Sequence, residues 1–299
     1  MNIVGAFACS HAALLITRAD KAPEAQRRAI YDAFVEMGRE IVASKPDAVV
    51  IVGTDHGRIY PLSALPQYTI GVSALARGIG DAGLPLKDVR IHQGLARELL
   101  RGCLDAGIDL AYSEAMTIDH SFLAPLLLSL PELDIPIVPL VQNCNAPPLP
   151  TLKRSHAVGT ALGEALRRGP AGRVVVIGTG GLSHWVGSPA FQNFMTEPAG
   201  TRLERQKEYP LTLTDTGHVN EEFDQAFIDL ICRGKAHEFL QEWDTERLRA
   251  AAGNGGQEIR NWLLVAGAVQ DQPARLLAYQ AVKEWLTGTA VVQFETALS

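Results

Sequence analysis

The hydrophobic pattern of the first fifty residues predicts a strand, a long helix and a second strand. The opening run from Met1 to Ser10 is mostly apolar and predicts the first strand. Between Pro23 and Ser44, apolar residues recur every three or four positions, which predicts an amphipathic helix with the proline in its first turn. These apolar positions are Ile30, Phe34, Met37 and Ile41. The next run, residues 48–53, is short, continuous and β-branched, which is typical of a strand buried on both faces.

The same alternation continues along the chain. The pattern predicts a helix over residues 89–104 before a strand at 109–112, and a helix over 152–168 before a strand at 173–178. Further strands are expected at 136–141 and 291–294, and residues 220–270 look mostly helical. Such alternation predicts an α/β fold with a largely parallel central sheet flanked by helices. Because no repeat, linker or low-complexity tract interrupts it, we expect residues 1–299 to form a single domain.

Composition narrows the class of protein. A chain of 299 residues with 47% hydrophobic residues can bury a sizeable core, and its net charge of -6 argues against a nucleic-acid partner. The four cysteines form no Cys-x-x-Cys pair, so reduced thiols are expected. The first residues lack the basic residues of a signal peptide, and no apolar run reaches the roughly 20 residues of a membrane span. We therefore expect a cytoplasmic protein with no membrane partner.

Four histidines lie just beyond predicted strands or loops with suggestive neighbours. They are His11, His56, His120 and His184, preceded respectively by Ser10, Asp55, Asp119 and Ser183. Open α/β sheets bind ligands at their strand ends, so several of these side chains can converge. Neutral imidazole binds metals and transfers protons near neutral pH, so two can hold a metal while two move protons. The other histidines, in helical segments, are expected at the surface: His92, His156, His218 and His237.

A metal site with two histidines usually adds one carboxylate and leaves positions open for substrate. Glu258 is the candidate. It follows Asn254, which is expected to cap a helix, so Glu258 is predicted in the first helical turn. From the local sequence alone, the favoured interpretation is a carboxylate that merely complements the positive end of the helix dipole.

Five motifs, in this order, resemble the LigB-like (class III) extradiol ring-cleavage dioxygenases, and the resemblance covers nearly the whole chain. They are Ser10-His11, Asp55-His56, Asp119-His120-Ser-Phe-Leu-Ala-Pro-Leu, Gly178-Thr-Gly-Gly-Leu-Ser-His184 and Gly-Gly-Gln-Glu258-Ile-Arg-Asn-Trp262. Within that family, Gly-Leu-Ser-His184 and Tyr279-x-x-Val-Lys-Glu-Trp285 look closer to 2,3-dihydroxyphenylpropionate 1,2-dioxygenases than to protocatechuate 4,5-dioxygenase β subunits.

The resemblance implies an iron(II) enzyme that opens a catechol-type ring beside its hydroxyls with O2. It implies that His11, His56 and Glu258 bind iron(II), and that His184 and His120 serve the acid and base steps. His184 is the leading base and His120 the leading acid, although these roles can be exchanged. The implied partners are a small aromatic diol or aminophenol and O2, in a homo-oligomer, with a small α-type subunit as a further option.

The neighbours of these residues have less certain roles. Asp55 and Asp119 can orient the adjacent histidines, pin loops, or simply cap a helix or turn. Gly180 and Gly181 are expected to let the backbone approach the substrate. Pocket walls are expected at residues 60–69, 122–126 and 185–194. The cations Arg58, Arg260 and Lys207 are interpreted as ordinary surface charges.

Two rival functions remain on the same scaffold, a zinc-dependent enzyme and a relative without catalysis. All five residues that the resemblance implies in metal binding and proton transfer are present, which argues against a relative without catalysis. A dinucleotide site is excluded because Ser183 stands where the third glycine of that fingerprint is needed. A serine hydrolase is excluded because no Gly-x-Ser-x-Gly elbow occurs.

Overall fold

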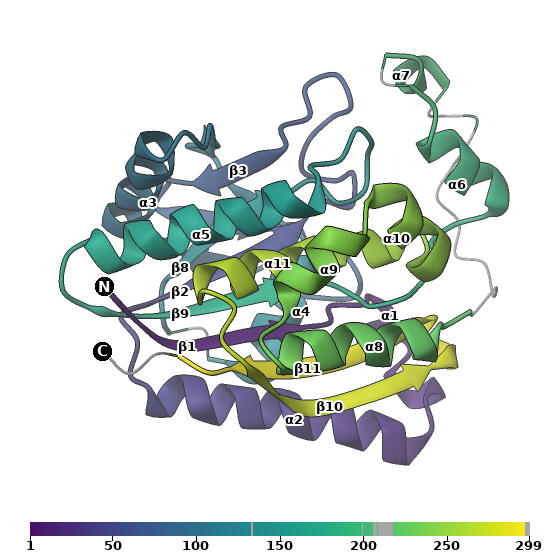
Figure 1. The fold of residues 1–299 in the computed structure, drawn as a ribbon, viewed down its shortest axis with the longest axis horizontal. Helices are drawn as coiled ribbons and strands as arrows, with labels where there is room; N and C mark the ends of the chain where they lie inside the picture. The colour runs from purple at the N-terminus through teal and green to yellow at the C-terminus, as the bar shows by residue number, and fades with distance from the viewer. Residues whose placement is uncertain (133, 199, 206–207, 209–217, 297–299) are drawn as a thin grey trace.

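The computed structural model of the chain describes residues 1–132, 134–198, 200–205, 208 and 218–296 (Figure 1). The strands are β1 (Asn2–Cys9), β2 (Ala48–Thr54), β3 (Tyr68–Gly71), β4 (Leu75–Gly78), β5 (Asp88–Arg90), β6 (Ala111–Ser113), β7 (Thr117–Ile118), β8 (Ile137–Gln142), β9 (Arg173–Thr179), β10 (Ala274–Val282) and β11 (Thr287–Phe294). The α-helices are α1 (Leu14–Thr17), α2 (Glu24–Ala43), α3 (Gln93–Asp105), α4 (His120–Ser129), α5 (Leu152–Arg168), α6 (Pro189–Met195), α7 (Arg202–Arg205), α8 (Glu221–Cys232), α9 (Ala236–Glu242), α10 (Thr245–Ala252) and α11 (Ile259–Ala268). Short 3₁₀ turns are η1 (Ala19–Lys21), η3 (Gly255–Glu258) and η4 (Lys283–Trp285).

Eight strands form a mixed sheet in the order β10-β11-β1-β9-β2-β8-β3-β6. The four central strands, β1, β9, β2 and β8, run parallel to one another. On one side the hairpin β10–β11 pairs antiparallel with β1, and on the other β3 pairs antiparallel with β8. A small second sheet has the order β5-β4-β7. The central strands are buried over nearly their whole length, as their continuous apolar runs predict.

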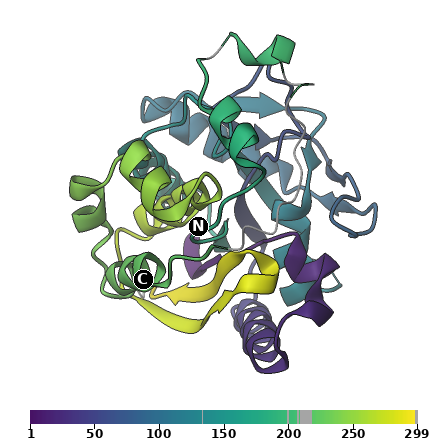
Figure 2. The same ribbon diagram turned by 90° about the vertical axis from the view of Figure 1, so that its right-hand side faces the viewer.

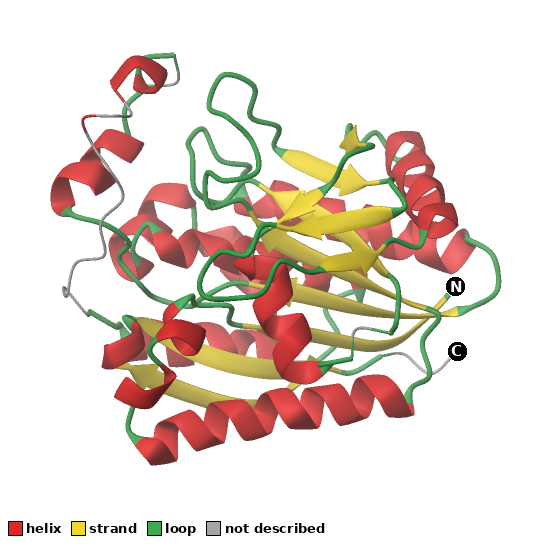
Figure 3. Ribbon diagram, turned by 180° about the vertical axis from the view of Figure 1, so that it is seen from behind, coloured by secondary structure: helices red, strands yellow, loops and turns green. Residues whose placement is uncertain are grey.

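Helices cover both faces of the sheet. Helices α5 and α11 pack together on one face (Figure 1), while α2 and α4 cover the other (Figure 3). Helix α2 also packs against the β10–β11 hairpin, as Figure 2 shows. Helices α6 and α7 stand out from the main body at one end (Figure 1). Among the described residues, no helix is both long and apolar enough to cross a membrane.

The prediction of an α/β fold with a helix-flanked central sheet is confirmed, although β11 and β3 pair antiparallel with the central strands. The helix predicted from residue 89 starts only at Gln93, because the His92 side chain accepts a hydrogen bond from the Leu95 N–H and caps the helix. Val89 lies instead in β5, and the strand predicted at 109–112 is β6.

Five strands were missed by the sequence pattern: β3, β4, β5, β7 and β10. The clearest case is β10, a nine-residue edge strand. Most of its residues are half-buried on both sides, so it lacks the apolar alternation that identifies a strand with one buried face.

Candidate metal centre and active site

Three of the predicted histidines lie together because they follow three neighbouring parallel strands. His11 comes two residues after β1, His56 two residues after β2, and His184 five residues after β9. In the sheet β9 lies between β1 and β2, and all three strands run in the same direction. Their carboxyl ends therefore deliver the three side chains to one edge, where such sheets commonly bind ligands.

His120 and Glu258 lie at the starts of two helices, and their side chains join the three histidines at this edge of the sheet. His120 is the first residue of α4, whose capping residue Asp119 accepts a hydrogen bond from the Ser121 N–H. Glu258 ends η3 and immediately precedes α11, so the prediction of a first helical turn is nearly right. The expected cap by Asn254 is wrong, since its side chain instead bonds the backbone of Val186.

The carboxylate of Glu258 lies at the centre of the cluster. Its Oε1 is 3.2 Å from Nε2 of His11 and 3.1 Å from Nε2 of His56. Its Oε2 accepts a hydrogen bond of 2.8 Å from the Gly181 N–H and lies 3.9 Å from Nε2 of His184. Burial alone would raise the pKa of Glu258, but His11 and His56 outweigh it and hold this pKa well below its usual value. Glu258 is therefore an ionised carboxylate in a buried position.

The outer nitrogens of His11 and His56 are already bonded. Nδ1 of His11 is 3.0 Å from Oγ1 of Thr179, whose hydroxyl donates to the Ser121 carbonyl, so His11 donates through Nδ1. Nδ1 of His56 lies 2.9 Å from the Asp119 carboxylate and donates to it. In both neutral rings Nε2 then carries the lone pair that faces inward. This arrangement is common behind metal-bound histidines, because the outer bond sets the tautomer and the ring orientation.

The donor set fits a divalent metal ion. Each of the two inward lone pairs lies within 3.2 Å of the same carboxylate oxygen, and the lone pairs and the oxygen repel one another unless a cation lies between them. Ligands about 2.1 Å from one ion and at right angles are about 3 Å apart, which agrees with these separations. Burial lowers the pKa of His11, which favours the neutral ring that a ligand must have. Burial alone would lower the pKa of His56, but Asp119 and Glu258 outweigh burial and raise this pKa. A proton on His56 can therefore take the place of the metal ion.

His120 packs against this cluster and has a carboxylate partner of its own. Its ring stacks on that of His56 with centroids 4.2 Å apart, and its Nδ1 lies 2.5 Å from Oδ2 of Asp81. Asp81 is a residue that the sequence analysis missed, because no motif or strand end marks it. His11, His56 and His120 also have nitrogen atoms within 4.8 Å of one another, so the distances alone allow His120 as a ligand.

His184 is fixed by its own turn. Its Nδ1 lies 2.8 Å from the Leu182 carbonyl and must donate to it, which leaves Nε2 as the acceptor of the neutral ring. Burial lowers its pKa, so the ring is neutral near physiological pH. Ser183 holds the turn, because its N–H and hydroxyl donate to Asp224 at 2.8 and 2.9 Å. Tyr279 of β10 donates to the same carboxylate at 3.0 Å.

Asp224 links the His184 turn to protein stability. Burial raises its pKa to about 6. In the unfolded chain the pKa of Asp224 is about 3.9. Below about pH 4 the side chain is therefore protonated in both the folded and the unfolded protein, and the stability that comes from burying neutral Asp224 is fully present. This contribution, roughly 3 kcal/mol, is lost as pH rises through about 6. Urea unfolding between pH 4 and 8 should therefore show a smaller fall in stability with pH for Asp224→Asn than for the unsubstituted protein.

Asp229→Asn is the matched control for that measurement, since Asp229 lies on the same helix with a side chain 59% exposed. It should leave the pH dependence unchanged. An unchanged slope in Asp224→Asn would mean that another group carries the pH dependence.

Two glycines make room for the site, but not in the way expected from sequence. A Cβ on Gly180 would lie 2.7 Å from Cβ of Glu258, and one on Gly181 would lie 2.7 Å from Cε1 of His184. These residues therefore let the side chains of the cluster approach the backbone. Neither Gly180 nor Gly181 lines the cavity described below. Gly255 is tighter still, because a Cβ there would overlap the His184 imidazole.

Gly255→Ala is expected to displace the His184 ring and lower turnover by roughly 10²-fold, since misplacement by about 1 Å has effects of this size. Metal content should stay at the level of the unsubstituted protein. The matched control is Gly94→Ala, whose added Cβ meets no atom closer than 3.8 Å. Full activity of Gly255→Ala would show that the position of this ring does not matter.

Both aspartates take one of the roles expected of them, since Asp55 holds a loop and Asp119 caps α4, and Asp119 also orients a histidine. Asp119 orients His56 rather than its neighbour His120, accepting from both N and Nδ1 of His56. Asp55 does not orient His56. Its carboxylate accepts three backbone N–H bonds from residues 58–60 and so pins the loop that follows β2.

Several peripheral predictions are corrected. Arg260 is not a surface charge but is fully buried, where it donates to Pro150, Gln257 and Thr245. Arg58 has an exposed side chain as predicted, whereas Lys207 lies outside the described residues. His218 and His237 are exposed, but His92 and His156 are half-buried, with His92 capping α3 and His156 bonded to Asp271.

A cavity of about 660 Å³ opens beside the cluster, with His56 and Glu258 in its lining. Of the predicted walls, residues 60–62 and 65 and residues 186, 191 and 194 line it. Residues 122–126 do not, because they are buried in α4. Asn143, Asn145, Met195, Leu203 and Asn254 were missed, since they come from loops and helices that only the fold brings together.

Known proteins resemble this chain over nearly its whole length. The family model for the catalytic LigB subunit of aromatic ring-opening dioxygenase matches residues 5–294. A 2,3-dihydroxyphenylpropionate/2,3-dihydroxicinnamic acid 1,2-dioxygenase from Photorhabdus laumondii is 30% identical over 293 residues, covering 90% of this chain and 91% of its own. A protein of the same name from Azotobacter vinelandii is 31% identical over 302 residues, covering 91% and 94%.

A crystal structure supports the fold alone. The uncharacterized protein JW3007 from Escherichia coli K12 superimposes with a TM-score of 0.55 at 16% identity, covering 98% of this chain and 100% of that chain. The match of the family model over residues 5–294 decides the family. The chain belongs to the LigB family of catalytic subunits of aromatic ring-opening dioxygenases and is an enzyme of that class.

Proposed function

We propose that this enzyme is an iron(II)-dependent extradiol dioxygenase that opens a catechol-type ring beside its hydroxyls and inserts both atoms of O2. The observation that carries the proposal is the buried carboxylate of Glu258 within 3.2 Å of the inward nitrogens of His11 and His56. Two histidines and one carboxylate with open positions are typical of non-haem iron(II) oxygenases. The names of the relatives from Photorhabdus and Azotobacter, both dioxygenases of an aromatic diol, support the same reaction class.

In this proposal, His11, His56 and Glu258 hold the iron. The chemistry that iron(II) supplies when bound is joint coordination of the diol and activation of O2. Thr179 and Asp119 fix the two histidine rings through their Nδ1 atoms. Gly181 fixes the carboxylate through its N–H. The protein thus fixes the positions of the three proposed iron ligands before the substrate binds.

Two further histidines move protons. A catechol must lose protons to bind through both oxygens, and Nε2 of neutral His184 is the base we assign, because Nδ1 already donates to Leu182. His120 is assigned as the acid of the later step. Its Nδ1 is held by Asp81, which leaves Nε2 for proton transfer.

We also propose that residues 1–299 act as one catalytic domain in a cytoplasmic homo-oligomer. The four cysteines are free, and three of them are buried, which suits a reducing compartment. The edge strand β6 and its Tyr112, 60% exposed, offer a surface for self-association. Analytical ultracentrifugation of the purified chain, with and without a small α-type subunit, tests this assembly.

The function is tested by anaerobic reconstitution with iron(II), followed by oxygen-electrode and absorbance assays on catechols, aminophenols and dihydroxypyridines. Iron-dependent O2 uptake with a yellow ring-opened product is the expected result. No uptake on any compound, together with zinc in the purified protein, would support the zinc-dependent alternative instead.

A further inference from the structure

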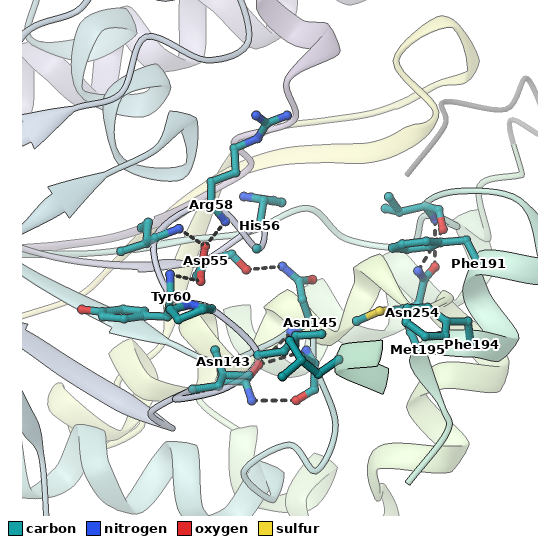
Figure 4. A pocket seen from close by; sticks show the side chains of 18 of the residues that line it. Asp55, His56, Arg58, Tyr60, Asn143, Asn145, Phe191, Phe194, Met195 and Asn254 are labelled. Atoms are coloured by element: carbon teal, nitrogen blue, oxygen red, sulfur yellow. Dashed lines mark hydrogen bonds between the residues drawn. The ribbon is translucent and has the colours of Figure 1, made fainter. Parts of the chain in front are cut away.

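The cavity beside the metal centre has a largely apolar wall. Its apolar side chains come from the loop after β2 and from the segment around α6, and they include Leu62, Leu65, Val186, Phe191, Phe194 and Met195. Figure 4 shows Phe191, Phe194 and Met195 on the side opposite Asp55 and Tyr60. At about 660 Å³ the cavity has the size of a typical small-molecule site and can hold much more than one catechol ring. The additional volume is therefore available to a ring substituent.

The polar side chains of the wall are largely used by the protein itself. Asn143 donates to Gln67 and Ala146, and its oxygen accepts from the Ala146 N–H at 3.0 Å. Asn254 accepts from the Val186 N–H and donates to its carbonyl, at 2.8 and 2.9 Å. Several of these bonds are drawn in Figure 4. These amides therefore shape the wall and are not available to pair with a charged substituent.

The charges near the cavity disfavour an anionic substituent. Its two carboxylates, Asp55 and Glu258, are both buried. Among the described lining residues outside the proposed metal ligands, the one cation is Arg58, whose side chain is 57% exposed and whose Nε lies 4.0 Å from Oδ2 of Asp81. In Figure 4 its guanidinium points away from the apolar wall. A carboxylate on the substituent would thus lose water without gaining a buried partner, which is unfavourable.

We propose that this cavity binds the ring substituent of the diol, and that this substituent is uncharged, apolar and about the size of a phenyl group. The proposal rests on the proposed function, because it places the diol at His56 and Glu258. An apolar group of that size gains affinity by leaving water for the side chains of Phe191, Met195 and their neighbours.

The test compares three diols, namely 3-phenylcatechol, 3-(2,3-dihydroxyphenyl)propionate and unsubstituted catechol. Dissociation constants are measured anaerobically by calorimetry, with iron(II)-loaded and with metal-free protein, and kcat/KM is then measured with O2. We expect 3-phenylcatechol to bind about 10-fold or more tightly than the propionate in both forms and to have the highest kcat/KM. Equal or tighter binding of the propionate would overturn the proposal.

Variants locate the preference in the cavity. Met195→Ala and Phe191→Ala remove half-buried apolar walls, and each should lower the ratio of kcat/KM for 3-phenylcatechol to that for catechol by about 5-fold or more. The matched control is Leu86→Ala, an apolar side chain 81% exposed and outside the cavity, which should not change the ratio. An unchanged ratio in both cavity variants would place the substituent elsewhere.

A gain-of-function variant makes the test independent of damage to the fold. Leu65→Arg introduces a cation into the wall and should improve the propionate relative to 3-phenylcatechol by about 10-fold. Failure of this proposal differs from failure of the proposed function. Cleavage of catechol with a preference for the propionate overturns the cavity assignment alone, whereas iron-loaded protein that cleaves no diol overturns the proposed function.

Discussion

Glu258→Gln is expected to lose bound iron and, with it, nearly all ring-opening activity. The substitution keeps the shape of the side chain but removes the charge that lies within 3.2 Å of two inward nitrogens. Loss of residues that merely orient metal ligands costs on the order of 10- to 100-fold in affinity, so loss of a proposed ligand should cost at least on the order of 100-fold. Metal analysis after anaerobic loading and desalting, beside oxygen uptake, gives the direct measurement.

The control for that variant is Glu246→Gln, which removes an exposed glutamate paired with Arg249 on α10. It should bind iron and turn over normally, because exposed ion pairs contribute little. His56→Ala should behave like Glu258→Gln. If Glu258→Gln retained one iron per chain, the carboxylate would not be a ligand, and the cluster of His11, His56 and His120 would become the better assignment.

His184→Ala and His120→Ala are expected to keep iron yet lose most turnover. Removal of a general acid or base typically costs 10²- to 10⁴-fold, and a loss on the order of 10³-fold in kcat is expected for each. The physical reason is that Nδ1 of each ring is anchored, to Leu182 and to Asp81, so that Nε2 is presented for proton transfer. Metal content and single-turnover rates with a cleaved diol measure both quantities on the same samples.

His237→Ala provides the control, since His237 is exposed on α9. The result for His120 has particular weight, because its ring stacks on His56 and its nitrogen atoms lie near enough to join the metal. Iron loss in His120→Ala, with iron retained in Glu258→Gln, would exchange their roles. Equal iron loss in all the site variants would overturn the division between ligands and proton-transfer groups.

Predictions from local pattern succeeded where the element is buried and regular. Strands β1, β2, β8 and β9 have continuous apolar runs, and α2 and α5 have apolar residues at helical spacing, so each was found near its observed bounds. Predictions failed for β3, β4, β5, β7 and β10, which are short or half-exposed. In such strands pairing with a neighbour, rather than the local pattern, determines the conformation.

The sequence by itself determined the class of fold and indicated five candidate positions for metal binding and proton transfer. Buried parallel strands place their carboxyl ends together, which is why His11, His56 and His184 were expected at one edge, and the ordered motifs added His120 and Glu258.

Only the tertiary structure decided which side chains contact and orient those five residues. It pairs Asp119 with His56 across 63 positions and Asp81 with His120 across 39, and it buries Arg260 beneath the Glu258 turn. It also assembles the cavity from the loop after β2, residues 143–146 and α6. The physical reason is that hydrophobic periodicity encodes which face of an element is buried, whereas side-chain partners distant in sequence depend on how the finished elements pack.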